Sequence, residues 1–220
     1  MVRGAGGGHA RPGPGGSYIA PLARLVLDWD GTVTEVDSLH MVLLEFGDVG
    51  VYERAEEDLG RGLTLHEVIE LEFATVRTPL AEVVPWLVEN VRVRAGFAEL
   101  VERFRPLVVS SGFHELIEPV LAREGVEVEL RANRLDPRAD GWRVRWRDEA
   151  ACPVCGEPCK RGLAASLGPF AYVGDGYSDR CVALAAERVF ARDGLAAYLD
   201  EQGAPYERFA DLGDVAAALA

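Results

Sequence analysis

Three short apolar stretches of this chain run directly into clusters of small polar or acidic residues. Residues 25–29 precede Asp30-Gly31-Thr32, residues 106–109 precede Ser110-Ser111-Gly112, and residues 170–173 precede Gly174-Asp175-Gly176. Short apolar runs bounded by turn residues are typical of buried β-strands. Because the segments between them carry helical apolar spacing, strands alternate with helices. This alternation predicts an α/β fold built on a parallel sheet that helices cover on both faces.

The rest of the chain extends the pattern. Residues 126–130 and 188–191 are predicted to be further strands, residues 115–123 a helix, and residues 130–147 a β-hairpin. The part that follows Leu195 is predicted to hold two short helices and a last strand. Together these elements describe a Rossmann-like, doubly wound sheet, in which ligand sites lie outside the carboxyl ends of the strands.

A long helical segment separates the first two predicted strands. Apolar residues recur in it at intervals of three and four, and Thr64 followed by Glu67 predicts a capping box at the start of one helix. We therefore predict a helical insertion over residues 37–104, placed after the first strand. It would interrupt a single core formed by residues 18–36 and 105–220.

The charge balance restricts the partners of this protein. The 220 residues include 36 acidic and 23 basic side chains, for a formal net charge of −13. Nucleic acids and anionic lipids attract positive surfaces, so we expect neither nucleic acid nor membrane as a partner. Residues 1–17, rich in glycine and proline, lack an apolar signal core and are predicted to be a disordered tail. We expect a cytoplasmic protein, and the sequence carries no signal for its oligomeric state.

Four carboxylates are expected to meet at one edge of the sheet. Asp28, Asp30, Asp175 and Asp179 all lie at or just beyond the ends of predicted parallel strands. Carboxylates in one crevice repel one another unless a cation or a proton intervenes, and an all-oxygen ligand set favours Mg²⁺. Side chains two residues apart in a strand share a face, so Asp28 and Asp30 can act on one substrate, as nucleophile and as acid/base.

Lys160 is the only lysine among the basic residues of the chain. A lysine ammonium is a compact point charge that the planar guanidinium of arginine does not replace. Lys160 is therefore a candidate for binding an anion, with chance retention as the alternative.

The sequence resembles the haloacid dehalogenase-like hydrolases, chiefly the phosphatases among them. Residues 28–34 resemble the first motif of that family. By this resemblance, Asp28 is the nucleophile that becomes an aspartyl-phosphate. Asp30 protonates the leaving alcohol and later activates water. Residues 108–110 resemble the second motif, which implies that the hydroxyl of Ser110, with Ser111 beside it, holds a phosphoryl oxygen.

The two remaining motifs follow in the order expected for the family. Lys160 resembles the third motif, which implies that its ammonium neutralises the phosphoryl group and the nucleophile. Residues 174–179 resemble the fourth motif, which implies that Asp175 binds Mg²⁺ and that Asp179 supports the site. The metal would also take Asp28 and the backbone carbonyl of Asp30.

The helical insertion at 37–104 resembles the small cap of the phosphoserine-phosphatase-like branch. Within this branch the sequence is most similar to the group that contains 2,3-diketo-5-methylthio-1-phosphopentane phosphatase and other small-metabolite phosphatases. Phosphoserine phosphatases carry a glutamate soon after the first motif that binds the substrate amine. Here Glu35 and Asp37 lie nearby at a different spacing.

The sequence thus predicts a Mg²⁺-dependent phosphatase that hydrolyses a small phosphorylated metabolite. Phosphoserine hydrolysis and phosphoryl transfer to an alcohol other than water are alternatives within the enzymes. An alternative of another class is a non-catalytic module that binds a phosphorylated ligand, although such a module has no use for the pair formed by Asp28 and Asp30.

A C-x₂-C-x₃-C cluster, formed by Cys152, Cys155 and Cys159, leads directly to Lys160. Three thiolates at this spacing suit a structural Zn²⁺ site when a fourth ligand joins them. The candidates for that ligand are Cys181 and His114. Free thiols and a disulfide are the alternatives, and a disulfide is disfavoured in the cytoplasm.

Overall fold

The computed structural model describes residues 24–220; the predicted tail at 1–17 lies outside them. The strands are β1 (Arg24–Leu27), β2 (Leu107–Phe113), β3 (Glu129–Asp136), β4 (Arg143–Arg145), β5 (Phe170–Gly174), β6 (Arg188–Ala191) and β7 (Glu207–Arg208). The helices are α1 (Ser38–Phe46), α2 (Val49–Asp58), α3 (Leu65–Phe73), α4 (Leu80–Asn90), α5 (Phe97–Phe104), α6 (His114–Glu124), α7 (Arg161–Ala165), α8 (Arg180–Ala183), α9 (Asp193–Gln202) and α10 (Leu212–Ala218). One turn of 3₁₀ helix spans Tyr177–Asp179.

The strands form one mostly parallel sheet of seven strands in the order β4-β3-β2-β1-β5-β6-β7. Only β4 is antiparallel, and it pairs with β3 as the second arm of the predicted hairpin. The sheet confirms the predicted α/β fold. In this order β1 lies between β2 and β5, so the carboxyl ends of these three strands are neighbours.

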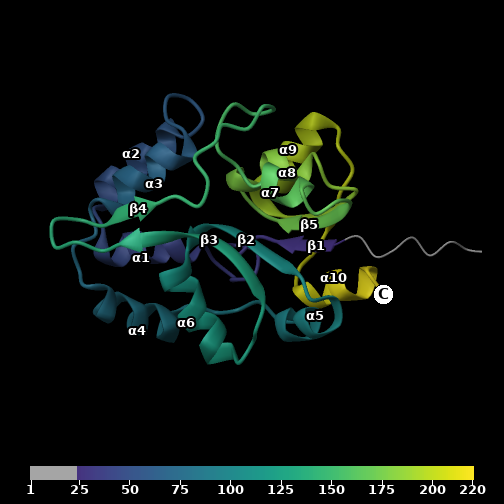
Figure 1. Cartoon of the computed structure of the whole chain (residues 1–220), viewed down its shortest axis with the longest axis horizontal. Helices are drawn as coiled ribbons and strands as arrows, with labels where there is room; N and C mark the ends of the chain where they lie inside the picture. The colour runs from purple at the N-terminus through teal and green to yellow at the C-terminus, as the bar shows by residue number, and fades with distance from the viewer. Residues whose placement is uncertain (1–23) are drawn as a thin grey trace, which may run out of the picture.

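Helices cover both faces of the sheet (Figure 1). The alternation of side chains along β1 explains this, because Leu25 and Leu27 face one layer and Val26 faces the other. Leu25 and Leu27 belong to the larger apolar core, with side chains of α4, α5, α6 and α10. Val26 belongs to a smaller core with side chains of α7, α8 and α9.

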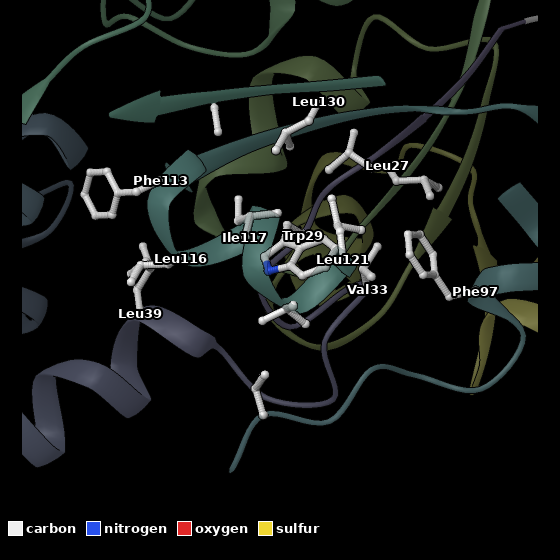
Figure 2. Close-up of a cluster of buried hydrophobic side chains, with 14 of the residues drawn as sticks. Leu27, Trp29, Val33, Leu39, Phe97, Phe113, Leu116, Ile117, Leu121 and Leu130 are labelled. Atoms are coloured by element: carbon white, nitrogen blue, oxygen red, sulfur yellow. The ribbon is translucent and has the colours of Figure 1, made fainter. Parts of the chain in front are cut away.

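The loop that follows β1 is anchored in the larger core by Trp29. Its indole is fully buried, as predicted from its place between Asp28 and Asp30. The indole packs edge-on against Phe97 at the start of α5, with 6.0 Å between ring centres. Figure 2 shows Trp29 among the aliphatic side chains of β1 and α6. This packing holds the loop that carries both aspartates against the core.

Five helices lie within the predicted insertion at 37–104, and they pack in two places. α2 and α3 contact each other, and α3 also contacts β4. α4 packs on α6 and α5 on α10, in the layer that covers the sheet. The capping box of Thr64 and Glu67 is present at the start of α3. The division of the chain into cap and core stays a prediction.

Some local predictions were wrong. Pro85, expected to start or break a helix, lies inside α4, where packing of Val83 and Leu87 in the core maintains the helix. The third strand begins at Glu129 rather than at Val126. Within residues 24–220, no helix has both the length and the apolar character that crossing a membrane requires.

Candidate active site

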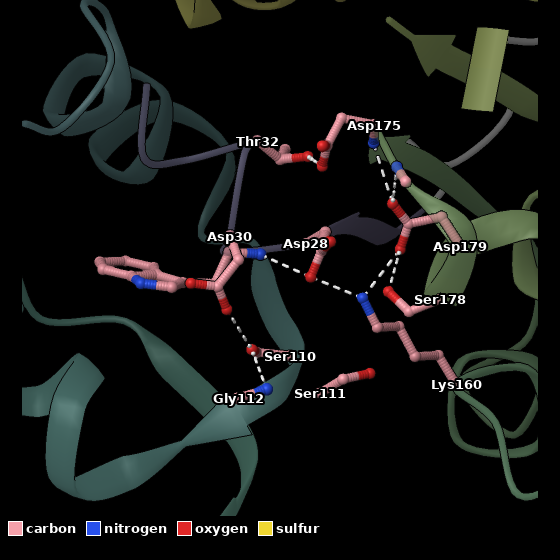
Figure 3. Close-up of polar contacts among 12 residues, drawn as sticks. Asp28, Asp30, Thr32, Ser110, Ser111, Gly112, Lys160, Asp175, Ser178 and Asp179 are labelled. Carbon is pink, nitrogen blue, oxygen red and sulfur yellow. Dashed lines mark hydrogen bonds and ion pairs between the residues drawn. The ribbon is translucent and has the colours of Figure 1, made fainter. Parts of the chain in front are cut away.

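The loops that follow β1 and β5 meet the last residues of β2 at one edge of the sheet, as the strand order requires. Asp28, Asp30, Ser111 and Asp175 line a single cavity of about 320 Å³ there. A second cavity, of about 340 Å³, adjoins it through shared lining residues and includes Lys160 in its wall. Three chain segments that are distant in sequence therefore converge on one site (Figure 3).

Lys160 lies between two buried carboxylates. Its Nζ is 2.5 Å from Oδ1 of Asp28 and 2.8 Å from Oδ1 of Asp179. Burial alone would lower the pKa of Lys160, but the charges of Asp179 and Asp28 outweigh burial and raise it. The side chain is therefore an ammonium, and it places one positive charge beside the predicted nucleophile.

Asp179 has most of its hydrogen-bonding capacity in use. Its Oδ1 accepts from Lys160, from the Tyr172 hydroxyl at 2.6 Å and from the Ser178 hydroxyl at 3.3 Å. Its Oδ2 accepts from the backbone N–H groups of Asp175 and Gly176. Burial would raise the pKa of Asp179, but Lys160 outweighs it and the pKa is lowered. Asp179 thus orients Lys160 and the turn after β5.

The Asp30 carboxyl is held on the other side of the cavity. Its Oδ1 accepts from the backbone N–H of Ser38 at 3.2 Å and from the Ser38 hydroxyl. Its Oδ2 accepts from the Ser110 hydroxyl at 3.3 Å. Burial, followed by repulsion from Asp37, raises the pKa of Asp30 to about 7. A carboxyl with this pKa can both donate and accept a proton near neutral pH.

The two serines within β2 differ in exposure. Ser110 is fully buried, and its hydroxyl also accepts from the backbone N–H of Gly112 at 2.7 Å. Ser111 is only partly buried and lines both cavities. Of the predicted pair, Ser111 is therefore the residue that faces the open space.

Three of the four predicted metal ligands form a compact set of oxygen donors. Carboxylate oxygens of Asp28, Asp175 and Asp179 lie within 4.8 Å of one another. Asp28 Oδ1 accepts from the backbone N–H of Trp29, and Asp175 Oδ1 accepts from the Thr32 hydroxyl. Asp28 and Asp175 therefore each keep a second oxygen with no hydrogen bond to the described residues, whereas both oxygens of Asp179 are in use. These donors fit Mg²⁺, which prefers one or two protein carboxylates and several waters.

The electrostatics of this set favour a bound cation. Burial, with repulsion from Asp179, raises the pKa of Asp28 well above its ordinary value and that of Asp175 to about 7. A divalent ion would supply the charge that keeps both groups ionised. The side chain of Asp30 lies outside the set, and its backbone carbonyl as a metal ligand stays a prediction.

Two residues of the site had no motif to reveal them. Arg94 is buried, and its guanidinium donates to the carbonyls of Gly31 at 2.8 Å, Thr32 at 2.9 Å and Thr34 at 3.1 Å. It therefore fixes the loop that carries Asp28 and Asp30. Tyr172 is the second of these two residues. Its only signal in the sequence is a hydroxyl within the otherwise apolar strand β5.

The rest of the cavity wall combines apolar and acidic side chains. Leu39, Leu59, Leu65, Val68 and Ile69 line it together with Asp37, Glu56, Glu72 and His40. Burial would lower the pKa of His40, but Glu56 and Asp37 raise it to about 9. Burial, then the charge of Glu56, raises the pKa of Glu72 to about 8.

The comparisons with known proteins identify the family of this chain. The family model described as haloacid dehalogenase-like hydrolase matches residues 25–184. A protein of Geobacillus kaustophilus (strain HTA426) named 2-hydroxy-3-keto-5-methylthiopentenyl-1-phosphate phosphatase is 31% identical over 209 residues, which cover 89% of this chain and 94% of that protein. A Bacillus cereus protein of the same name is 26% identical and covers 89% of this chain and 95% of its own length.

Solved structures show the same fold. A structure described as a phospho-aspartyl intermediate analogue of phosphoserine phosphatase superimposes with a TM-score of 0.66 at 18% identity, over 90% of this chain and 99% of that chain. Phosphoserine phosphatase from T. onnurineus gives a TM-score of 0.65 at 20% identity, over 92% of this chain and 98% of its own. The chain therefore belongs to the haloacid dehalogenase-like hydrolase family, which confirms both the family that its motifs resemble and the predicted class of enzyme.

Proposed function

We propose that this protein is a Mg²⁺-dependent phosphatase that hydrolyses a small phosphorylated metabolite through an aspartyl-phosphate on Asp28. The observation that carries the proposal is the placement of two different carboxyl groups on one cavity. Asp28 has one oxygen with no hydrogen bond to residues 24–220 and has Lys160 beside it, whereas burial raises the pKa of Asp30 to about 7. One group is suited to attack phosphorus and the other to move a proton.

In the first step, the free oxygen of Asp28 attacks phosphorus and the bond from phosphorus to the leaving oxygen breaks. The proton of the Asp30 carboxyl passes to the leaving oxygen, so the alcohol departs neutral. In the second step, Asp30 takes a proton from water, and the resulting hydroxide attacks the phosphorus of the aspartyl-phosphate. Inorganic phosphate leaves, Asp28 is a carboxylate again, and Asp30 carries a proton for the next cycle.

Charge neutralisation and positioning account for most of the expected rate enhancement, as is usual in phosphoryl transfer. Mg²⁺, held by Asp28, Asp175 and the backbone carbonyl of Asp30, would neutralise the phosphoryl oxygens and the nucleophile. The Lys160 ammonium supplies a further positive charge at Asp28. We assign contacts to phosphoryl oxygens to Lys160 and to the hydroxyls of Ser110 and Ser111, with Asp179 as the support of Lys160.

The names of the relatives suggest the first substrate to test. The Geobacillus kaustophilus protein is named as a phosphatase for 2-hydroxy-3-keto-5-methylthiopentenyl-1-phosphate, and the aliphatic part of the cavity wall suits an apolar leaving group. The acidic part favours a second candidate, an amine-bearing monoester such as phosphoserine. Asp37, Glu56 and Glu72 line the same cavity as the predicted nucleophile.

Replacing Asp28 with Asn tests the proposal. We expect Asp28→Asn to abolish Mg²⁺-stimulated hydrolysis of p-nitrophenyl phosphate and of both candidate substrates, with unchanged circular dichroism. The matched control is Asp58→Asn, an exposed aspartate at the end of α2, which should retain full activity. Acid-quenched wild-type enzyme should carry a phosphoryl group on the peptide that contains Asp28. Turnover that persists in Asp28→Asn would refute the mechanism.

Two further measurements separate the alternatives. Phosphoryl transfer to an acceptor other than water would appear as new phosphate esters when competing alcohols are added during turnover. A non-catalytic binding module would bind phosphorylated metabolites and yet hydrolyse none of a broad panel, with or without Mg²⁺.

A further inference from the structure

The four cysteines of the chain converge at one place outside the catalytic carboxylates. We call them the cysteine cluster: Cys152, Cys155, Cys159 and Cys181. The first three lie on the loop that leads to α7, and the fourth lies on α8. All four Sγ atoms are within 4.8 Å of one another, and no pair is bonded as a disulfide. His114, the other candidate for a fourth ligand, instead pairs with Glu118 on its own helix.

The spacing of these sulfurs matches a shared tetrahedral centre. At a Zn–S distance of about 2.3 Å, the sulfurs of a regular tetrahedron are about 3.8 Å apart. The Sγ atoms of Cys152 and Cys181 are 3.9 Å apart. Disulfides join sulfurs in pairs at about 2.05 Å, and no two of these four sulfurs are bonded in this way. Mutual approach of four sulfurs is the arrangement that a metal requires.

The backbone around Cys152 is arranged to support a thiolate. The N–H of Val154 points at the Cys152 sulfur, with 3.4 Å between the two atoms. The turn is closed by a bond from the N–H of Gly156 to the carbonyl of Cys152 at 2.8 Å, and Gly156 has a φ of +83°, which favours glycine. Backbone donors that point at a ligand sulfur orient it and stabilise its negative charge.

We propose that the cysteine cluster binds one Zn²⁺ ion in a tetrahedral, structural site. On binding, four S–H bonds break, their protons pass to solvent, and four Zn–S bonds form without a change of oxidation state. Four thiolates leave no open position for water, which is the pattern of structural rather than catalytic zinc.

The proposed ion joins the two chain segments that carry the buried ion pair of the active site. Cys159 directly precedes Lys160, and Cys181 follows Asp179 by two residues. α7 and α8 also contact each other, and Arg161 donates to the carbonyl of Cys181 at 3.0 Å. The zinc site is therefore a positioning device for Lys160, and this consequence, unlike the site itself, rests on the proposed function.

Metal content of the full-length protein, purified without added chelator, tests the site directly. We expect one zinc per chain by elemental analysis. Cys155→Ser removes the most exposed ligand and Cys181→Ser the one that α8 contributes. Each should lower zinc affinity by more than about 100-fold, which exceeds the loss expected when a residue that only supports a ligand is changed. Glu149→Gln changes an exposed residue of the same loop and should keep its zinc.

Two further readouts identify the ligands and the alternatives. Protein reconstituted with Co²⁺ should show the sulfur-to-metal charge-transfer band of a tetrahedral thiolate site, and Cys155→Ser should weaken it. Substoichiometric zinc with four rapidly alkylated thiols would overturn the proposal. A disulfide detected in the native protein by mass spectrometry, or iron in place of zinc, would overturn it as well. Since zinc content does not depend on turnover, an inactive protein that holds zinc would refute the proposed function and leave the site intact.

Discussion

Lys160 and Asp179 form a buried ion pair, with 2.8 Å between Nζ and Oδ1, although 19 residues separate them. The same ammonium contacts Asp28. Removal of one partner from a buried pair leaves uncompensated charge in a poorly solvated place, which costs about 3–5 kcal/mol. Lys160 is therefore a determinant of stability as well as a candidate catalytic group.

We predict that Lys160→Met abolishes turnover and lowers the free energy of unfolding by about 3 kcal/mol or more at neutral pH. The loss should shrink in acid, because protonation neutralises the carboxylates left without their partner. Urea unfolding at several pH values measures both effects. Arg103→Met breaks an exposed pair with Glu99 and should cost at most about 1 kcal/mol. Equal losses for the two variants would contradict the assignment.

Arg94 is predicted to be a positioning residue for the loop after β1. Arg94→Met removes donors from three carbonyls of that loop, and we expect the free energy of unfolding to fall by about 2 kcal/mol or more. The rate constant kcat should fall too, since Asp28 and Asp30 lie on this loop. Arg92→Met, which alters an exposed neighbour, is the matched control. A stable Arg94→Met enzyme with the kcat of the wild type would show that the loop holds its shape without the guanidinium.

The fold and the centre of the site were predictable because their signals are local. β1, β2 and β5 are apolar runs that end in polar residues, and parallel pairing brings their ends together. Arg94 left no such signal, because its contact with Thr32 spans 62 residues. Cys181 likewise stood out only as the one other cysteine, since its approach to Cys152 depends on where the fold places the short helix α8.

The role of Asp30 as a proton donor can be tested by the choice of leaving group. p-Nitrophenolate is a stable anion and departs without a proton, whereas the strongly basic alkoxide of an alkyl phosphate must be protonated as it leaves. We therefore expect Asp30→Asn to slow formation of the phosphoenzyme from an alkyl phosphate by about 10²–10⁴-fold and from p-nitrophenyl phosphate far less. Rapid-quench measurement of the first turnover separates this step from the later attack by water. An equal loss for both substrates would mean that Asp30 serves some purpose other than protonation.

The carboxyl of Glu72 is expected to make the free energy of unfolding depend on pH. It is buried, its Oε1 has no hydrogen-bond partner within the described chain, and burial raises its pKa from 4.5 to about 8. Between these two values the folded state binds more protons than the unfolded state, so the contribution of Glu72 to stability falls as pH rises. Glu72→Gln removes this titration. The stability of Glu72→Gln relative to wild type should therefore increase from pH 5 to pH 8, by a few kcal/mol at about 1.4 kcal/mol per pKa unit.

Thermal and urea unfolding of both proteins across this range measure the difference. Glu89→Gln is the matched control, because it removes an exposed carboxylate and should give a difference that does not change with pH. His40 faces the same acidic group and carries a positive charge over the whole range, since Glu56 and Asp37 raise its pKa to about 9. In the unfolded chain the imidazole titrates near its ordinary pKa of about 6.5, so His40 adds a pH dependence to each protein, but this contribution is common to both and cancels in the difference. A constant stability difference for Glu72→Gln would mean that Glu72 is ionised throughout, and the acidic wall would then present one more negative charge to an amine-bearing substrate.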